Sequence, residues 1–180
     1  MKRRIMAYVL FAVGIGIYVF TMQPTVGLID SGELSLAAWR LGIAHPTGYP
    51  LYTILGRIFT LLPFEPILMT NFMSSFFTAL SGMLIFLIIS GSGDEKRRLI
   101  AGGLASLLFM VSHTVWQTAV VTEVYALEIF LDILVVFLFY QGFERNSRLL
   151  VVGAVVAGLS FGNHMQKMLY VPSLLLMMFM

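Results

Sequence analysis

Residues 27–50 read Gly27-Leu-Ile-Asp30-Ser-Gly-Glu33-Leu-Ser-Leu-Ala-Ala-Trp39-Arg40-Leu-Gly-Ile-Ala-His45-Pro-Thr-Gly-Tyr49-Pro50, a polar stretch in a chain that is otherwise mostly apolar. It combines two carboxylates, an arginine and a histidine with a turn rich in Pro and Gly. An apolar chain gains no stability from such a loop, because charged groups favour water over hydrophobic surroundings. We therefore interpret this stretch as the functional loop, with Asp30 as its candidate catalytic group.

The composition places the chain in a membrane. Of 180 residues, 59% are hydrophobic and only 11% are charged, whereas soluble domains average roughly 25% charged residues. The mean hydropathy is +0.92. The absence of cysteine excludes a disulfide framework and a thiolate metal site. A net charge of +2, spread over short clusters, gives no reason to expect a nucleic-acid partner.

The hydropathy pattern predicts an all-α, multi-pass transmembrane bundle of about six spans, since a crossing helix needs about 20 apolar residues. The expected spans are 5–22, 66–90, 99–121, 124–140, a short fifth at 149–162 and a sixth that begins at Met168. Residues 51–62 contain Arg57 and precede Pro63, which favours an interfacial or re-entrant helix. The sixth span is too short unless the chain continues, so we expect residues 1–180 to be one transmembrane module, the N-terminal part of a longer protein.

The basic residues predict the orientation, because Lys and Arg are enriched in cytoplasmic loops. Eight of them share one side (Lys2, Arg3, Arg4, Lys96, Arg97, Arg98, Arg145 and Arg148) and three share the other (Arg40, Arg57 and Lys167). We therefore expect a cytoplasmic N-terminus in an integral membrane protein, and the cytoplasmic membrane as its location if the source is prokaryotic. The corners around Asp30, Glu123 and His164 then meet on the opposite side.

The motif Asp30-Ser-Gly-Glu33 has two compatible interpretations. It resembles a capping box that opens an amphipathic surface helix over residues 31–41. That helix would place Leu34, Ala37, Ala38 and Leu41 on one face. Capping explains neither the length of the loop nor the turn that follows, and a cap would also hold a catalytic carboxylate in place.

The run His45-Pro46-Thr-Gly48-Tyr49-Pro50 predicts a stiff, non-helical turn, because each proline disfavours the helical conformation of the residue before it. His45 is either a ligand contact or a structural hydrogen-bonding group, and Tyr49 alternatively belongs to the interfacial aromatic belt. Arg57 either binds phosphate or extends toward the lipid headgroups.

Further ionisable residues occur at later corners and inside the fourth span. Glu123 and Tyr125 lie at the corner before that span, and Glu128 and Asp132 share a face within it. Ionisable groups inside spans are costly and usually mark function. The carboxylates could bind a metal, but no ligand set has a diagnostic spacing. We expect His113 to be a hydrogen-bonded core histidine.

The corner of Asn163, His164 and Lys167 follows the short fifth span. At 1.5 Å per residue that span is about 21 Å long, so the corner would lie at the depth of a lipid headgroup. His164 and Lys167 could neutralise a lipid phosphate there. The alternative is a plain polar turn.

Three motifs, in order and covering essentially the whole chain, resemble a family of multi-pass membrane proteins formerly catalogued as a domain of unknown function. That family is placed with the protein O-mannosyltransferase-like, GT-C type glycosyltransferases. The motifs are Asp30-Ser-Gly-Glu33 with Leu41-Gly-Ile-Ala-His45-Pro-Thr-Gly-Tyr49-Pro50-Leu-Tyr, then Trp116-Gln-Thr-Ala-Val-Val-Thr-Glu123-Val-Tyr125-Ala-Leu, then Gly158-Leu-Ser-Phe-Gly162-Asn163-His164 with Pro172. Members are usually longer, with further spans and often a soluble C-terminal domain.

The resemblance implies an inverting transfer of a sugar, with mannose the candidate, from a polyprenyl-phosphate carrier to a hydroxyl of a protein or glycan acceptor on the non-cytoplasmic side. It implies Asp30 as the general base. The candidate donor and substrate contacts are Glu33, His45, Tyr49, Arg57, Glu123, Tyr125, Asn163, His164 and Lys167. We expect no metal and no other cofactor, although a divalent cation stays compatible with these residues.

Two other classes of function remain open from the residues alone. A transporter or lipid flippase would carry its charges near the middle of the membrane, and Glu128 with Asp132 keeps this alternative open, although most charges cluster at the surfaces. An inactive, truncated module of the same family is the third alternative.

Overall fold

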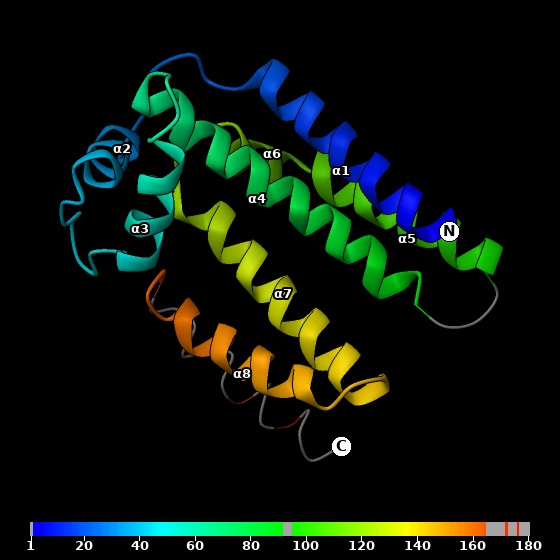
Figure 1. Cartoon of the computed structure of the whole chain (residues 1–180). Coiled ribbons are helices and arrows are strands. Elements are labelled where there is room, and N and C mark those ends of the chain that lie inside the picture. The colour runs from blue at the N-terminus through cyan, green and yellow to red at the C-terminus, as the bar shows by residue number, and fades with distance from the viewer. Residues whose placement is uncertain (1, 92–94, 165–171, 173–175, 177–180) are drawn as a thin grey trace.

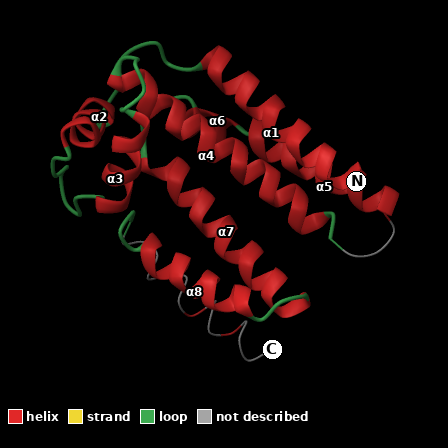
Figure 2. Ribbon diagram, in the orientation of Figure 1, coloured by secondary structure: helices red, strands yellow, loops and turns green. Residues whose placement is uncertain are grey.

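The computed structural model describes residues 2–91 and 95–164, together with Pro172 and Leu176. The described elements are α-helices, without a strand among them (Figures 1 and 2). In chain order they are α1 (Lys2–Thr21), α2 (Ser31–Arg40), α3 (Pro50–Phe59), α4 (Pro66–Ile89), α5 (Glu95–Val111), α6 (His113–Ala119), α7 (Val124–Glu144) and α8 (Arg148–Ser160). This confirms the predicted all-α class.

Three helices, α1, α4 and α7, are long and apolar enough to cross a membrane. The pair α5 and α6 makes a fourth crossing if it is counted as one bent span. Helix α8 is apolar but shorter, with 13 residues. The multi-pass membrane bundle is thus confirmed with three or four spans in the described residues rather than about six, and the expected sixth span at Met168 falls outside them.

The expected continuous third span is broken. Helix α5 ends at Val111, and α6 leaves it at an angle of 65°. Ser112 between them is extended, and its hydroxyl donates to the carbonyl of Phe109 at 2.9 Å. Such a local bond competes with the helical ladder and favours a break. His113 begins α6 as an exposed residue, so the expectation of a core histidine was wrong.

Helix α4 is the centre of the bundle and packs against α1, α5 and α7. Near its N-terminal end, the buried Asn71 donates to the carbonyl of Gln23 at 2.8 Å and accepts from the Thr122 hydroxyl at 2.5 Å. Gln23 follows α1 and Thr122 precedes α7. One buried side chain therefore holds together two loops at the end of the bundle where the polar segments gather.

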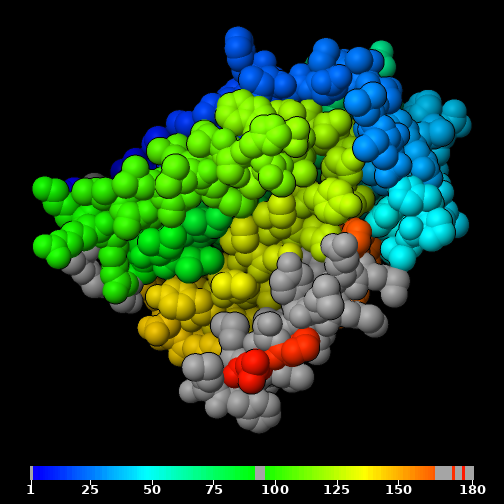
Figure 3. All heavy atoms as spheres, turned by 180° about the vertical axis from the view of Figure 1, so that it is seen from behind, coloured from blue at the N-terminus to red at the C-terminus, as the bar shows by residue number. Residues whose placement is uncertain are grey.

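Helices α2 and α3 pack on each other at that end of the bundle (Figure 1). Seen from behind, their atoms lie at the opposite end of the molecule from those of α5 (Figure 3). Helix α2 buries Leu34, Ala37 and Ala38, as expected. Leu41, expected on the same face, is instead 58% exposed, because the chain leaves the helix there in a left-handed conformation with φ 52°.

Candidate active site

A chain reversal after α2 brings His45 back to the start of that helix. Leu41 is left-handed, and the amide of Gly42 donates to the carbonyl of Ala37 at 2.9 Å, which closes the helix end. Residues 42–45 then return along α2. The backbone N–H of His45 donates to Glu33 Oε1 at 2.6 Å, and its ring Nδ1 lies 3.1 Å from Glu33 Oε2. An ionised carboxylate only accepts, so Nδ1 is the donor.

This pairing replaces the capping box that the sequence suggested. Asp30 is the N-cap residue of α2, but its side chain makes no capping hydrogen bond. Glu33, which a capping box would turn back to the N-cap amide, bonds to His45 instead. The Asp30 carboxylate is therefore not occupied as a helix cap.

The other ring nitrogen of His45 faces two further candidate residues. Its Nε2 lies 3.8 Å from Asp30 Oδ2 and 3.1 Å from the hydroxyl of Tyr49. With Nδ1 donating to Glu33, a neutral His45 accepts at Nε2 from Tyr49, and a protonated one presents its charge to Asp30. His45 thus connects both carboxylates of the motif with Tyr49.

His164 joins the same cluster from the far end of the described chain. Its ring stacks on Tyr49, with 5.9 Å between centroids and 28° between planes, and lies 5.8 Å from the ring of Tyr125. Its Nδ1 is 3.9 Å from Oε2 of the buried Glu128. Asp30 and His164 are therefore linked through His45 and Tyr49, as the proposed common site requires.

Two hydrogen bonds hold the corner before His164 against α3 and α7. The amide of Leu51 donates to the carbonyl of Gly162 at 2.9 Å, and the buried Asn163 side chain donates to the carbonyl of Val124 at 3.2 Å. The side-chain nitrogen of Asn163 therefore holds this corner in place against α7. Its Oδ1 is buried and has no hydrogen-bond partner among the described residues.

Glu123, the residue before α7, lies within electrostatic reach of the cluster. Partial burial raises the pKa of its carboxyl, and the negative charge of Asp30 raises that pKa further, whereas His45 lowers it. Glu123 also raises the pKa of the hydroxyl of Tyr52, although burial of that tyrosine is the larger cause. Glu123 thus lies near Asp30. The raised pKa means that the Glu123 carboxyl is neutral more often than a carboxyl at the surface.

Arg57 does not join this cluster. Arg57 donates to the carbonyl of Trp39 at 2.6 Å, at the C-terminal end of α2. Asp30 precedes the other end of that helix, about 15 Å away at 1.5 Å per residue. Arg57 therefore satisfies an orphan carbonyl of α2, a role that neither sequence interpretation had named. Lys167 lies outside the described residues.

Glu128 is the site residue that the sequence argument left out of its candidate set. It is only 6% exposed and lies beside His164. The signal that could have found it was present, because a carboxylate inside an apolar span is costly and usually faces a functional interior.

Among the residues that the structure describes, Asp30, Glu33 and His45 form a group that could hold a divalent cation. Each offers a ligand atom, and these atoms lie within 4.8 Å of one another. Carboxylate oxygens and an imidazole suit several divalent metals. The side chains of Asp30 and Glu33 are 41% and 47% exposed, and the bonds between Glu33 and His45 give both residues a role without a metal.

The bonds from His45 are expected to keep the loop closed in mild acid. They hold the pKa of the Glu33 carboxyl below its ordinary value, the ring contribution being larger than the backbone one. A carboxyl whose pKa falls on folding stabilises the fold above its unfolded pKa, and loses that contribution as the pH falls through its folded pKa. A spin label on Thr47→Cys is therefore expected to stay immobile in mild acid and to become mobile only below the ordinary carboxyl range.

Glu33→Gln is expected to make the spin label mobile already at neutral pH. The glutamine side chain has only one accepting oxygen, so it cannot accept hydrogen bonds from both the backbone N–H and the ring Nδ1 of His45. Glu65→Gln, which alters an exposed carboxyl before α4, serves as the control. A label whose mobility rises near the ordinary carboxyl pKa in the parent chain would show that His45 does not hold Glu33 in its ionised form.

The comparison with known families decides the classification. The profile described as "Protein O-mannosyl-transferase TMEM260 N-terminal domain" matches residues 30–180, starting at Asp30. The chain belongs to this family. The resemblance read from the three motifs is thereby confirmed.

Two curated relatives of the TMEM260 N-terminal domain family share the name of the profile. The mouse protein named "Protein O-mannosyl-transferase TMEM260" is 33% identical over 169 residues, which cover 89% of this chain and 24% of the relative. The Dictyostelium discoideum protein named "Protein O-mannosyl-transferase tmem260" is 32% identical over 115 residues, covering 62% of this chain and 14% of the relative. The chain thus spans about a quarter or less of these proteins. No solved structure matches it.

Proposed function

We propose that this chain is the catalytic N-terminal module of a membrane mannosyltransferase, which transfers mannose from a polyprenyl-phosphate carrier to a hydroxyl of a protein acceptor. The observation that carries the proposal is the gathering of Asp30, His45, Tyr49 and His164 at one end of an apolar helix bundle. The names of the two curated relatives support the reaction class. We also propose that this end is non-cytoplasmic, since eight of eleven basic residues are expected on the other side.

The chemistry assigns a role to each part of the cluster. Asp30 accepts the proton of the acceptor hydroxyl while that oxygen attacks the anomeric carbon, and the bond from that carbon to the phosphate oxygen breaks on the opposite face. The configuration at the anomeric carbon inverts, and the leaving lipid phosphate keeps the bonding electron pair. Its developing charge needs cationic or N–H donors, and we assign this role to His45 and His164.

Glu33 and Glu128 act through the histidines rather than on the substrate. Each carboxylate lies beside one imidazole, Glu33 at 3.1 Å from His45 and Glu128 at 3.9 Å from His164. A carboxylate behind an imidazole fixes the orientation of the ring and therefore which nitrogen faces the site. This pairing gives the site two oriented histidines on either side of Tyr49.

A transfer assay tests the proposal. The full chain, reconstituted in lipid vesicles, is given labelled polyprenyl-phosphate mannose and a serine-containing peptide, and the product is analysed for the anomeric configuration of the new bond. Transfer with inversion is expected, and nucleotide-activated mannose is expected to give none. Transfer only from the nucleotide donor would overturn the lipid donor, whereas passage of labelled lipid across the bilayer without transfer would favour a flippase.

A further inference from the structure

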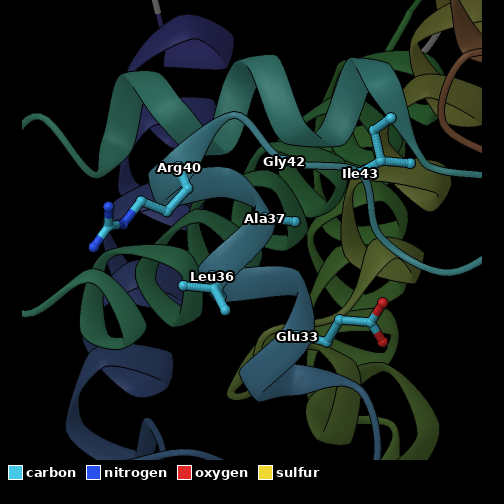
Figure 4. Close-up of a pocket in the computed structure, with 6 residues that line it drawn as sticks. All are labelled: Glu33, Leu36, Ala37, Arg40, Gly42 and Ile43. Atoms are coloured by element: carbon cyan, nitrogen blue, oxygen red, sulfur yellow. The ribbon is translucent and has the colours of Figure 1, made fainter.

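A groove of about 600 Å³ lies along the outer side of α2, between that helix and the returning segment 42–45 (Figure 4). Its lining residues are Glu33, Leu36, Ala37, Arg40, Gly42 and Ile43. The four from α2 have the spacing of a single helix face, and the last two belong to the chain reversal. The same reversal that places His45 beside Glu33 therefore also forms the second wall of this groove.

Glu33 connects the groove to the candidate active site. Glu33 lines the groove and also binds His45, whose ring lies beside Asp30. A molecule lying in the groove would therefore contact a residue that is itself bonded to the catalytic cluster. The groove and the catalytic cluster thus share Glu33, whereas Asp30 and His45 do not line the groove.

The other end of the groove carries an uncompensated positive charge. Arg40 is exposed, and its guanidinium lies 4.4 Å from the ring centroid of Trp39, which holds it in place. In the described ranges Arg40 forms no ion pair with a carboxylate. Figure 4 shows the side chains of Glu33 and Arg40 pointing to opposite sides. An anionic group bound at this end would meet the exposed Arg40, while Arg57 at the same end of α2 donates to the carbonyl of Trp39.

We propose that this groove binds an extended polypeptide segment of the acceptor, with an acidic side chain at Arg40 while the accepting hydroxyl lies at Asp30. The proposal rests on the proposed function and specifies its acceptor. Ten residues of helix separate Asp30 from Arg40, about 15 Å. An extended peptide spans about 3.3 Å per residue, so the acidic residue stands four or five positions from the hydroxyl. Leu36 and Ile43, 55% and 90% exposed, contact the side chains between them.

The charges of the groove favour a polypeptide over a lipid. A bound lipid would need a continuous apolar channel with its phosphate at a cation, whereas this groove has a carboxylate at one end and a guanidinium at the other. A peptide can offer a hydroxyl at the first end and a carboxylate at the second. Charge complementarity of this kind gives specificity more than affinity.

Binding without a sugar donor tests the groove independently of the reaction. Fluorescent peptides that contain one serine and one aspartate, one to six positions apart, are titrated by anisotropy against the full chain in nanodiscs. Aspartate four or five positions away is expected to tighten binding by up to about fivefold relative to glutamine, the range of an exposed ion pair. Arg40→Asp is expected to reverse the preference toward lysine, and Arg148→Gln, an exposed arginine of α8, is expected to change nothing.

Cross-linking locates the peptide, because the chain contains no cysteine of its own. A cysteine placed midway in the peptide is expected to form a disulfide with Ile43→Cys and not with Ile58→Cys, which is exposed on α3. Equal affinity for all charge positions, equal cross-linking at both sites, or protection of Ile43→Cys by anionic vesicles instead of peptide would overturn the groove. Charge-dependent binding without any mannose transfer would overturn the proposed function and leave the groove intact.

Discussion

Asp30→Asn is expected to lower the rate of mannose transfer at least about 100-fold, the contribution that a positioned general base makes. The amide has nearly the same shape as the carboxylate but cannot accept the acceptor's proton. Helix α2 is expected to stay intact, because the Asp30 side chain makes no capping hydrogen bond. The fall should therefore appear in kcat, with binding of the lipid donor and the far-UV circular dichroism unchanged.

Glu144→Gln is the matched control. It neutralises an exposed carboxylate at the end of α7 that lies away from the candidate site. It should transfer mannose at the parent rate. Retention of more than about a tenth of the parent activity by Asp30→Asn would assign the base to another group. Glu123 would then be the next candidate, because its charge interacts with both Asp30 and His45.

The bundle could be predicted from the sequence because long apolar runs leave few alternatives in a membrane. Helices α1, α4 and α7 begin and end within a few residues of the expected spans. The break at Ser112 was not predicted in this way, because the hydropathy averaged over α5 and α6 together is still that of a crossing helix, although Ser112, His113 and Thr114 interrupt the apolar run. A single hydroxyl that bonds back to Phe109 is a small local signal within a strong hydropathy pattern.

The common site could be anticipated because alternating crossings bring alternate corners to one side. That argument joined Asp30 to His164, and the structure links them through His45 and Tyr49. The partner of Glu33 could not be anticipated, because it depends on a reversal at Leu41. A leucine with positive φ has no sequence signature.

Arg40 and Arg57 show the same limit of prediction from the sequence. Arg40 is the last residue of α2 and Arg57 lies in the last turn of α3, and the sequence analysis named only Arg57 as a candidate contact. The structure gives Arg57 a backbone carbonyl and leaves Arg40 exposed in the groove. Which of two basic residues is available to a ligand depends on the packing of α3 against α2, and the sequence pattern does not contain that information.

The packing of α3 against α2 leads to the second large effect, which is expected from Gly56→Ala. A Cβ at Gly56 would lie 2.7 Å from Cβ of Ala38, so α2 and α3 must move apart. Overpacking of this kind costs about 1–3 kcal/mol. A shift of about 1 Å in catalytic groups can lower a rate about 100-fold, and α2 carries Glu33 beside Asp30. Both the thermal midpoint and the transfer rate should therefore fall.

The Ala38→Gly change removes the atom that the new Cβ meets, so the double variant Gly56→Ala, Ala38→Gly should regain much of the lost transfer. The cost of glycine inside α2, up to about 1 kcal/mol, should remain in its unfolding midpoint. Gly16→Ala is the matched control, because apart from its chain neighbours and the adjacent backbone of α1 nothing lies within 4 Å of its added Cβ. A double variant no more active than Gly56→Ala alone would show that the contact between Gly56 and Ala38 does not hold the two helices in register. Trp39 fluorescence, measured in a Trp116→Phe background, reports the position of α2 directly.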